Sequence, residues 1–290
     1  LIGANAANTW TLNGDDRVGL VGYWNFDNNT TDWSGYGYDG TLVNGATYST
    51  SVPPTSFANT NSISLVRANS QKVTFGATLD SPNLTVSAWF YATATNDGYY
   101  HSIVGNERGG CSSGNRGWFL FELGGTLNSE YGIGTGCGGV SPGPHIQPNT
   151  WYQVAMTFDS VTATLYLDGQ QVGQRGAATR ALATESLAVG RINAGDSDFY
   201  FSGNIDDVRI YNRALTAAEI AGQNVGNIGG SFYFANIENL TGGTGADTFV
   251  YSNGGSVSGA IDGNGGALTL QSSIAIPIST VTSTGGNITF

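Results

Sequence analysis

Short runs in which hydrophobic and polar residues alternate predict β-strands along most of the chain. In the run LTVSAWFY at residues 84–91, each face of the strand carries apolar bulk and an aromatic ring, which predicts a central strand. Runs at 118–123 and 127–134 flank Gly124-Gly125, and runs at 151–158 and 162–167 flank a three-residue turn, so each pair predicts a hairpin. We therefore expect an all-β fold, a β-sandwich of two packed sheets.

The strand expected at residues 205–211, IDDVRIY, contains two adjacent aspartates. Strict alternation places one set of side chains on one face (Asp206, Val208, Ile210) and the rest on the other (Ile205, Asp207, Arg209, Tyr211). A carboxylate aligned with aliphatic side chains is costly to desolvate unless a cation or hydrogen-bond donors meet it, so Asp206 needs a partner. After this strand, Thr216 and Glu219 fit a capping box, which predicts a short helix to about Gln223.

The composition is typical of an extracellular all-β protein. The chain has 290 residues with 44 glycines, which suit many tight turns, and 40% of its residues are hydrophobic, enough for a large sandwich and a smaller unit. A single lysine (Lys72) and a net charge of −11 argue against nucleic acid as a partner. No apolar run approaches the roughly 20 residues of a membrane span, so we expect no membrane insertion. The absence of a signal peptide at Leu1 suggests the interior of a longer secreted protein.

Three sequence blocks, in a fixed order, carry a family resemblance. They are VGYWNFDNNTTDWSGYGYDGTLVNGA (21–46), WYQVAMTFDSVTATLYLDGQQVG (151–173) and GNIDDVRIYNRALTAAEI (203–220). Together they resemble the laminin-G-like, concanavalin A-like jelly-roll family over residues 18–223. The resemblance implies a jelly-roll β-sandwich, with a structural calcium ion at the place that Asp206 matches.

Residues from the first and last strands of the sandwich are candidates for holding that calcium ion. Asp27 ends the first strand and Asp206 begins the last, so pairing of these strands would bring both carboxylates to one edge. Calcium takes about six to eight oxygens and accepts backbone carbonyls and water, and Asn69, in the segment 67–69, is a third candidate. The alternative is that Asp206 is hydrogen-bonded to loop amides or paired with an arginine.

Two cysteines, Cys111 and Cys137, flank the hairpin expected around Gly124-Gly125. Because the ends of a hairpin lie close together, we predict a disulfide between them, which would stabilise the fold by about 3 kcal/mol. The alternative is a pair of free thiols in a cytosolic protein, which the acidic, lysine-poor composition disfavours.

The segments on either side of the sandwich differ from it in character. Residues 224–290 consist of short strand-like runs between Gly-Asn and Gly-Asp turns, which suggests a β-solenoid-like tail. The segment GGTGADTFV (242–250), with Asp247, matches a nine-residue β-roll repeat in which turn aspartates bind calcium. Such a site needs stacked neighbouring turns, and the nearest candidate, which begins at Asp262, lacks the second aspartate, so the match is weak evidence for a metal site. Residues 1–17 read as the N-terminal half of a solenoid-like repeat, so we expect the sandwich to be inserted into that repeat. Contact between residues 8–12 and 228–240 is required by this hypothesis.

The ionisable residues favour binding over catalysis. Glycanases related to the resembled family carry Glu-x-Asp-x-(x)-Glu on a single strand, and no such stretch occurs here. The glutamates are scattered singly, and neither His101 nor His145 accompanies a nucleophile motif. Sugars stack on aromatic rings while charged and amide groups bind their hydroxyls. Candidate ligand-binding residues of this kind are Trp89, Tyr91, Tyr99, Tyr100, Glu107, Arg108 and Trp118. For any one of these aromatic residues, a place in the core is the competing interpretation.

We therefore expect a non-catalytic, calcium-stabilised recognition module within a large secreted or cell-surface adhesin. Its ligand is expected to be a glycan, and the isolated fragment is expected to be a monomer. The alternatives are a protein-binding adhesion module or a structural spacer, because the resembled fold serves all these roles. A polysaccharide-active enzyme is the third possibility.

Overall fold

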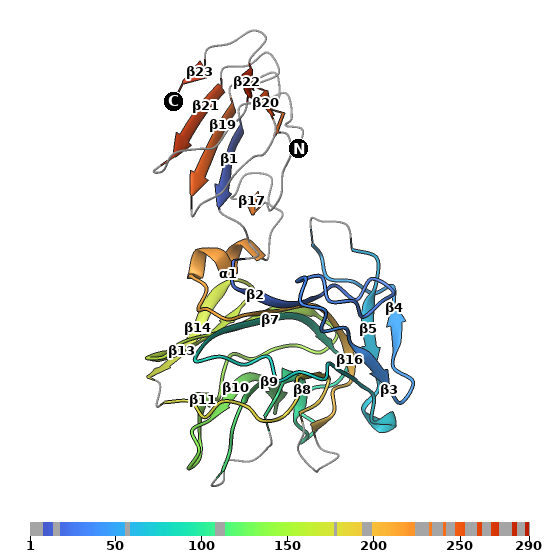
Figure 1. Ribbon diagram of the computed structural model, residues 1–290. Coiled ribbons are helices and arrows are strands. Elements are labelled where there is room, and N and C mark those ends of the chain that lie inside the picture. Colours follow the sequence, from blue (N-terminus) through green and yellow to red (C-terminus); the bar gives the residue numbers. More distant parts are fainter. Residues whose placement is uncertain are drawn as a thin grey trace. The chain divides into compact units, whose positions relative to one another are not determined.

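The computed structural model describes most of the sandwich and the strands of the flanking segments. The described residues are 8–13, 18–55, 59–107, 114–176, 179–192, 199–223, 232–233, 240–241, 247–252, 260–262, 268–272, 280–282 and 288–289. The chain divides into two compact units (Figure 1): residues 19–224 form one, and residues 1–18 together with 225–290 form the other. No helix among the described residues is long and apolar enough to cross a membrane.

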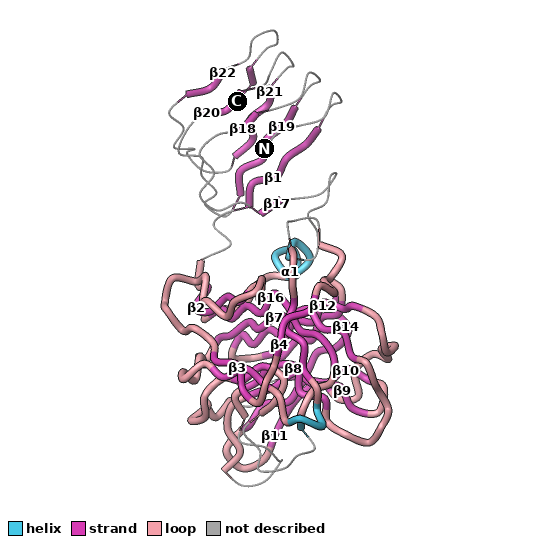
Figure 2. Tube along the Cα trace, turned by 90° about the vertical axis from the view of Figure 1, so that its right-hand side faces the viewer, coloured by secondary structure: helices cyan, strands magenta, loops and turns pink. Residues whose placement is uncertain are grey.

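Two antiparallel sheets face each other in the larger unit (Figures 1 and 2). The eight-stranded sheet has the order β14 (Gln170–Gly176), β13 (Thr162–Leu167), β12 (Trp151–Asp159), β7 (Asn83–Ala92), β16 (Gly203–Tyr211), β5 (Ser62–Leu65) and β4 (Thr47–Ser49), with β2 (Leu20–Trp24) also paired to β16. The seven-stranded sheet has the order β11 (Cys137–Val140), β10 (Thr126–Gly132), β9 (Trp118–Leu123), β8 (His101–Gly105), β15 (Ala188–Val189), β6 (Lys72–Thr74) and β3 (Thr41–Val43). The expected two-layer β-sandwich is confirmed.

Local sequence patterns located these strands well. The hairpins β9–β10 and β12–β13 form where the turns were expected, and β7 lies between β12 and β16 as a central strand should. Helix α1 (Ala217–Gln223) begins at the predicted capping box: Glu219 accepts from the backbone N–H of Thr216 at 2.7 Å, and the Thr216 hydroxyl accepts from the N–H of Glu219 at 3.3 Å.

The main core lies between the two sheets. On β7 the inward-facing side chains are Leu84, Val86, Ala88, Phe90 and Ala92, and they meet Trp118 and Leu120 of β9. A second apolar cluster lies on the outer face of the eight-stranded sheet, where Ile220 of α1 packs with Tyr211 and Ala155. A third covers the outer face of the seven-stranded sheet around Phe119 and Phe121.

The alternation predicted for β16 is wrong after Asp206. Asp207 adopts the left-handed conformation (φ +46°) and creates a β-bulge, in which two residues of β16 lie opposite the single residue Ala88 of β7. Ile205 therefore points into the core together with Val208, rather than to the opposite face. Asp206, paired with Trp89, lies on the outer face of the sheet and not in line with the aliphatic residues.

The smaller unit consists of two parallel sheets. The first has the order β17 (Phe232–Tyr233), β1 (Asn8–Asn13), β19 (Asp247–Ser252), β21 (Leu268–Ser272) and β23 (Ile288–Thr289), and the second has the order β18 (Leu240–Thr241), β20 (Ala260–Asp262) and β22 (Thr280–Thr282). Strand β1, which precedes the sandwich in sequence, pairs with β17 and β19, which follow it. Leu12 lies opposite Phe232, a contact of the kind that the insertion hypothesis requires.

Candidate functional site

Asp27 ties the end of the first sandwich strand to the beginning of β5. Directly after β2 the chain turns through Phe26, which has a φ of +49°. Asp27 Oδ1 then accepts hydrogen bonds from the backbone N–H groups of Thr60 (2.7 Å) and Asn61 (3.0 Å) and from the Thr60 hydroxyl (2.8 Å). The carboxylate is thus held in place by loop amides at the edge of the sheet.

Asp206 is fully buried next to other acids. Its Oδ2 accepts from the Asn59 side-chain amide at 2.8 Å, and its Oδ1 accepts from the backbone N–H of Asp207 at 2.9 Å. Burial raises the pKa of Asp206 to about 8, and the negative charges of Asp207 and, to a smaller extent, Asp27 add to this effect. Asp27 and Asp206 are thus within electrostatic reach of each other, and their sharing of a metal ion stays a prediction.

Asp207, which the sequence analysis did not single out, joins this carboxylate centre. Its Oδ1 accepts from the Tyr23 hydroxyl (2.8 Å) and from the Arg209 guanidinium (3.3 Å), which lies over the Tyr23 ring. Burial raises the pKa of Asp207 even though the positive charge of Arg209 opposes the shift. Arg209 thus balances Asp207, whereas no basic side chain of the described residues forms an ion pair with Asp206.

The donor chemistry of this centre fits a hard divalent cation. Asn59 Oδ1 and Asp207 Oδ2 are buried without a hydrogen-bond donor, and carboxylate and amide oxygens are the ligands that calcium prefers. Among the described residues, no group of three or more His, Cys, Asp or Glu side chains has the arrangement of a metal site. The third predicted ligand, Asn69, ends the 3₁₀ turn η1 (Arg67–Asn69), where its N–H donates to Val66 O.

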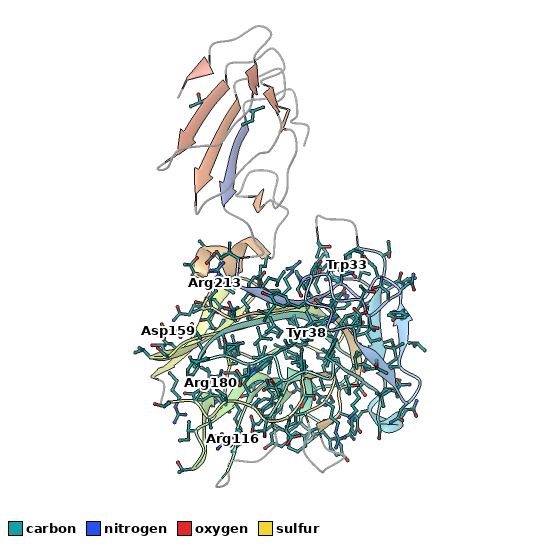
Figure 3. All side chains as sticks on the ribbon, in the orientation of Figure 1. Trp33, Tyr38, Arg116, Asp159, Arg180 and Arg213 are labelled. Carbon is teal, nitrogen blue, oxygen red and sulfur yellow. The ribbon has the colours of Figure 1, made fainter. Side chains whose placement is uncertain are left out.

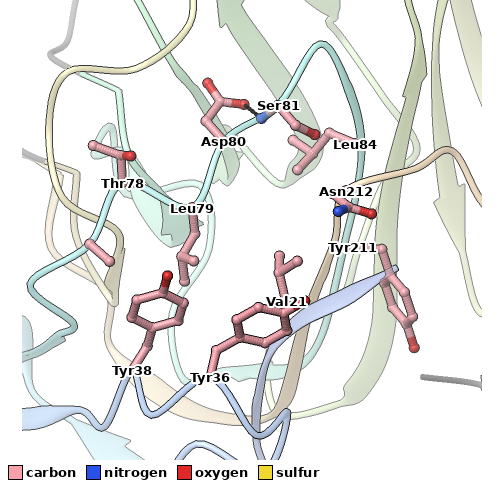
Figure 4. Close-up of a pocket in the computed structure, with 11 residues that line it drawn as sticks. Val21, Tyr36, Tyr38, Thr78, Leu79, Asp80, Ser81, Leu84, Tyr211 and Asn212 are labelled. Atoms are coloured by element: carbon pink, nitrogen blue, oxygen red, sulfur yellow. Dashed lines mark hydrogen bonds between the residues drawn. The ribbon is translucent and has the colours of Figure 1, made fainter. Parts of the chain in front are cut away.

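A pocket of about 350 Å³ lies beside the start of β7 and the end of β16 (Figure 4). Its lining residues come from four separate parts of the chain: Val21, Tyr36, Tyr38, Ala77, Thr78, Leu79, Asp80, Ser81, Leu84, Tyr211 and Asn212. The rings of Tyr36 and Tyr38 stand side by side along one wall, parallel to within 2° and with centroids 6.2 Å apart. Tyr36 is 60% exposed, so most of its surface is available to a ligand.

The loop that carries the two tyrosines is organised by Asp32. This buried carboxylate accepts from the N–H groups of Tyr23 (3.0 Å), Ser34 (2.9 Å) and Tyr38 (3.0 Å) and from the Ser34 hydroxyl. The carbonyl of Tyr38 in turn accepts from the Trp24 indole at 2.9 Å. The tyrosine wall is therefore fixed to the core of the sandwich before any ligand arrives.

On the opposite wall of the pocket, the negative charge of Asp80 is balanced by Arg180. Asp80 forms a buried ion pair with Arg180 and also accepts from the N–H of Ala183 at 2.8 Å. The exposed side chains of Thr78 and Asn212 add a hydroxyl and an amide to the rim (Figure 4). The pocket thus offers aromatic surface and uncharged polar groups.

The residues predicted to bind a glycan are divided between the two sheets. Trp118 is fully buried in the core, and Trp89 is only 5% exposed, opposite Asp206. Tyr91 packs against Trp151 on the eight-stranded sheet, whereas Tyr100 packs between Phe121 and Phe199 on the seven-stranded sheet. Neither tryptophan ring is open to a ligand.

The remaining predicted residues have other neighbours. The Tyr99 ring lies 3.1 Å from the guanidinium carbon of Arg67, and Glu107 is fully buried beside Asn115. Arg108 lies outside the described residues. No local sequence pattern predicts the pocket, because its walls come from distant segments; the one available signal is the glycine-rich stretch SGYGYDG, which contains Tyr36 and Tyr38.

Only one of the two cysteines in the predicted disulfide is among the described residues. Cys137 opens β11, opposite Gly132 of β10, while Cys111 lies outside the described residues. The pairing of the two cysteines stays a prediction.

Two antiparallel sheets packed face to face around one core define a jelly-roll β-sandwich of the concanavalin A type. Residues 67–221, more than half of the chain, match the family model described as the concanavalin A-like lectin/glucanases superfamily. The chain belongs to this superfamily, which confirms the resemblance over residues 67–221. No curated protein matches the chain by sequence.

Several solved structures share the fold. Domain 4 of AbnA, a GH43 extracellular arabinanase from Geobacillus stearothermophilus solved in complex with arabinotriose, is 20% identical, with 70% of this chain and 96% of that domain covered and a TM-score of 0.51. The binding domain of Paraclostridial Mosquitocidal Protein 1 is 16% identical (71% and 52% covered, TM-score 0.53). The receptor binding domain of botulinum neurotoxin D is also 16% identical (71% and 52% covered, TM-score 0.51). The chain spans about half the length of these two toxin domains.

Proposed function

We propose that the sandwich is a non-catalytic module that binds a neutral carbohydrate in the pocket beside Tyr36 and Tyr38. The observation that carries this proposal is the parallel pair of tyrosine rings, Tyr36 exposed and Tyr38 half-buried, on a hydrogen-bonded loop that faces a rim of hydroxyl and amide groups. Aromatic faces take the C–H surfaces of a sugar, and the polar rim binds its hydroxyls. The volume of about 350 Å³ is at the lower end of the range for small-ligand sites, so the ligand is a short segment of glycan.

Charge favours a neutral sugar over an acidic one. The net charge of −11 repels anionic polysaccharides, and Arg180 is already engaged by Asp80. The likeness to domain 4 of AbnA adds support, because that domain was solved with arabinotriose bound. An extracellular setting agrees with the acidic, lysine-poor composition of this chain, and the AbnA arabinanase is itself extracellular.

The proposed module has no catalytic role at this pocket. Hydrolysis of a glycosidic bond ordinarily needs two carboxyl groups flanking the bond. Asp80 is the single carboxylate among the described lining residues, and its negative charge is committed to Arg180. Turnover of a bound polysaccharide would revive the enzymatic alternative.

A glycan array with matched variants tests the binding site. Tyr36→Ala is expected to weaken binding about tenfold by removing one stacking surface, whereas Tyr36→Phe keeps most of the affinity. Trp33→Ala is the control, because Trp33 is a 51% exposed aromatic residue of the same loop that does not line the pocket. Equal loss of binding in Tyr36→Ala and Trp33→Ala would contradict the assignment. If the folded protein binds no glycan, a protein-binding module or a structural spacer becomes the better interpretation.

The carboxylate centre is proposed to hold a structural calcium ion. Asp27, Asp206 and Asn59 would supply oxygen ligands, and the ion would neutralise the buried charge of Asp206 and join the end of β2 to β16. This role is stabilising, because Asp206 lies on the outer face of the sheet and is not a lining residue of the tyrosine pocket.

The smaller unit is proposed to be a short β-solenoid that carries the sandwich as an insertion. Strands starting at residues 247, 268 and 288 belong to one parallel sheet, and strands starting at 240, 260 and 280 belong to the other, so the chain returns to each sheet about every 20 residues. Such a unit suits an extended surface adhesin in which solenoid coils position a recognition module. Deletion of residues 1–13 should then destabilise the second unit by removing β1 from the middle of its sheet. Unchanged unfolding of that unit would reject the proposal.

A further inference from the structure

Two glutamates, one from the segment after β8 and one from β10, meet on the outer side of the seven-stranded sheet. Glu107 lies two residues after the end of β8 and is fully buried. Glu130 is half-buried on β10, opposite Phe119 of β9, whose side chain belongs to the outer cluster. The two carboxyl groups are close enough to share a proton. Nothing in the sequence pattern connects them, because they come from separate segments.

Within the described part of the chain, no positively charged side chain balances this pair. Burial, followed by the charge of Glu130, raises the pKa of Glu107 to about 9, and burial also raises the pKa of Glu130. No lysine, arginine or histidine occurs among the described contacts of either glutamate. Two adjacent carboxyl groups with no cation are unfavourable unless a proton or a metal ion lies between them.

Two further oxygen atoms at the same place lack hydrogen-bond donors. The Asn115 amide donates to Glu107 Oε1 at 2.8 Å, which fixes the amide against the carboxyl pair. Asn115 is 3% exposed, and its Oδ1 is buried without a donor. Glu107 Oε2 is likewise buried and receives no N–H or hydroxyl hydrogen bond. Buried oxygen atoms in proteins normally bind a hydrogen-bond donor, a water molecule or an ion.

We propose that Glu107, Asn115 and Glu130 form a second divalent-cation site, which takes calcium through carboxylate and amide oxygens. Oxygen ligands without nitrogen or sulfur select calcium over zinc, and water reaching the half-buried Glu130 would complete the coordination. The site belongs to the seven-stranded sheet, so it is separate from the Asp27–Asp206 centre on the eight-stranded sheet. A bound ion would tie the chain that leaves β8 to the middle of β10.

Calcium titration by calorimetry on the full chain tests this site. Glu130→Gln and Glu107→Gln keep the side-chain volume but remove a carboxylate, and each is expected to bind one calcium ion fewer than the unmodified chain. Asp206→Asn removes the other proposed site, so Asp206→Asn combined with Glu130→Gln should lose one ion more than Asp206→Asn alone. Glu185→Gln, which lies outside both sites, should leave the number of ions unchanged.

Stability measured with a chelator present separates loss of binding from loss of folding. Without calcium, Glu107→Gln should be at least as stable as the unmodified chain, because it removes repulsion between two buried carboxyl groups. With calcium, it should gain less thermal stability than the unmodified chain. An unchanged number of bound ions in both folded glutamine variants would overturn the proposal and leave a carboxyl pair that shares only a proton.

Terbium luminescence sensitised by Trp118, which follows Asn115 closely in sequence, provides an independent measurement of the loss of ion binding in these variants.

Discussion

Arg180 and Asp80 form an ion pair whose side chains are only 1% and 2% exposed, and this pair closes the polar wall of the tyrosine pocket. The guanidinium carbon of Arg180 also lies 4.8 Å from the centroid of the Phe158 ring, so the pair is anchored on the core. Figure 3 shows Arg180 on the sandwich well apart from Trp33, which is on the loop that carries the tyrosines. The pocket therefore depends on a charge pair made by segments 100 residues apart.

Breaking this ion pair from one side should be strongly destabilising. Arg180→Met leaves the Asp80 carboxylate buried without its cation, and we expect a loss of about 3–5 kcal/mol in the free energy of unfolding, measured with urea. The double variant Asp80→Asn with Arg180→Met should lose clearly less, because no charge then remains unpaired. Arg116→Met, at an exposed arginine, is the control and should change stability by less than about 0.5 kcal/mol. Equal losses in the single and double variants would contradict this account.

Removal of calcium should lower the melting temperature through the Asp27–Asp206 centre. An ion that binds only the folded chain stabilises it by about 2.7 kcal/mol at a concentration of 100 Kd, so a chelator should cost an amount of that order. Asp206→Asn should reduce the response to calcium, and in chelator it should not be less stable than the unmodified chain, since it removes a buried carboxyl group. Scanning calorimetry with and without calcium measures both effects. A calcium response that is the same in Asp206→Asn and Glu185→Gln would exclude this centre.

The sequence predicted the parts of the fold that depend on short-range patterns. Alternation located β7 and the two hairpins, and the Thr216–Glu219 spacing located α1, because the periodicity and the cap are properties of consecutive residues. The Asp207 bulge was not predictable by alternation, since one left-handed residue shifts every following side chain to the other face.

Contacts between residues that are distant in sequence could not be predicted from local patterns. The short connection between β5 and β6 would suggest a hairpin from sequence, yet the two strands belong to opposite sheets, because η1 carries the chain across the sandwich between them. Asp27 and Asp206 could be connected because paired terminal strands bring their ends together. The Glu107–Glu130 pair and the pocket walls depend on how loops pack, and no local pattern records that.

The capping box of α1 should make a small, pH-dependent contribution to the free energy of unfolding. Burial alone would raise the pKa of Glu219, but hydrogen bonds from Arg213 and Thr216 outweigh it and lower the pKa. A carboxyl group with a lowered pKa stabilises the fold above its unfolded value, about 4.3, and loses that effect as the pH falls. Glu219→Gln should therefore cost less than about 1 kcal/mol at pH 7, given partial solvent screening, and close to nothing at pH 3. A cost that stays constant between these pH values, measured by urea unfolding, would contradict the role of the charge.

The first residue of β16 has no room for a side chain. Gly203 has a φ of +136°, and a Cβ added there would lie 1.9 Å from the carbonyl oxygen of Tyr91 on β7. Gly203→Ala must push β16 away from β7 at the end nearest Asp206, so we expect a loss of at least about 3 kcal/mol in urea unfolding together with a weaker calcium response. Gly176→Ala is the matched control, because nothing lies within 4 Å of an added Cβ there. Its stability should change by less than about 0.5 kcal/mol, and equal behaviour of the two variants would show that β16 and β7 can separate without penalty.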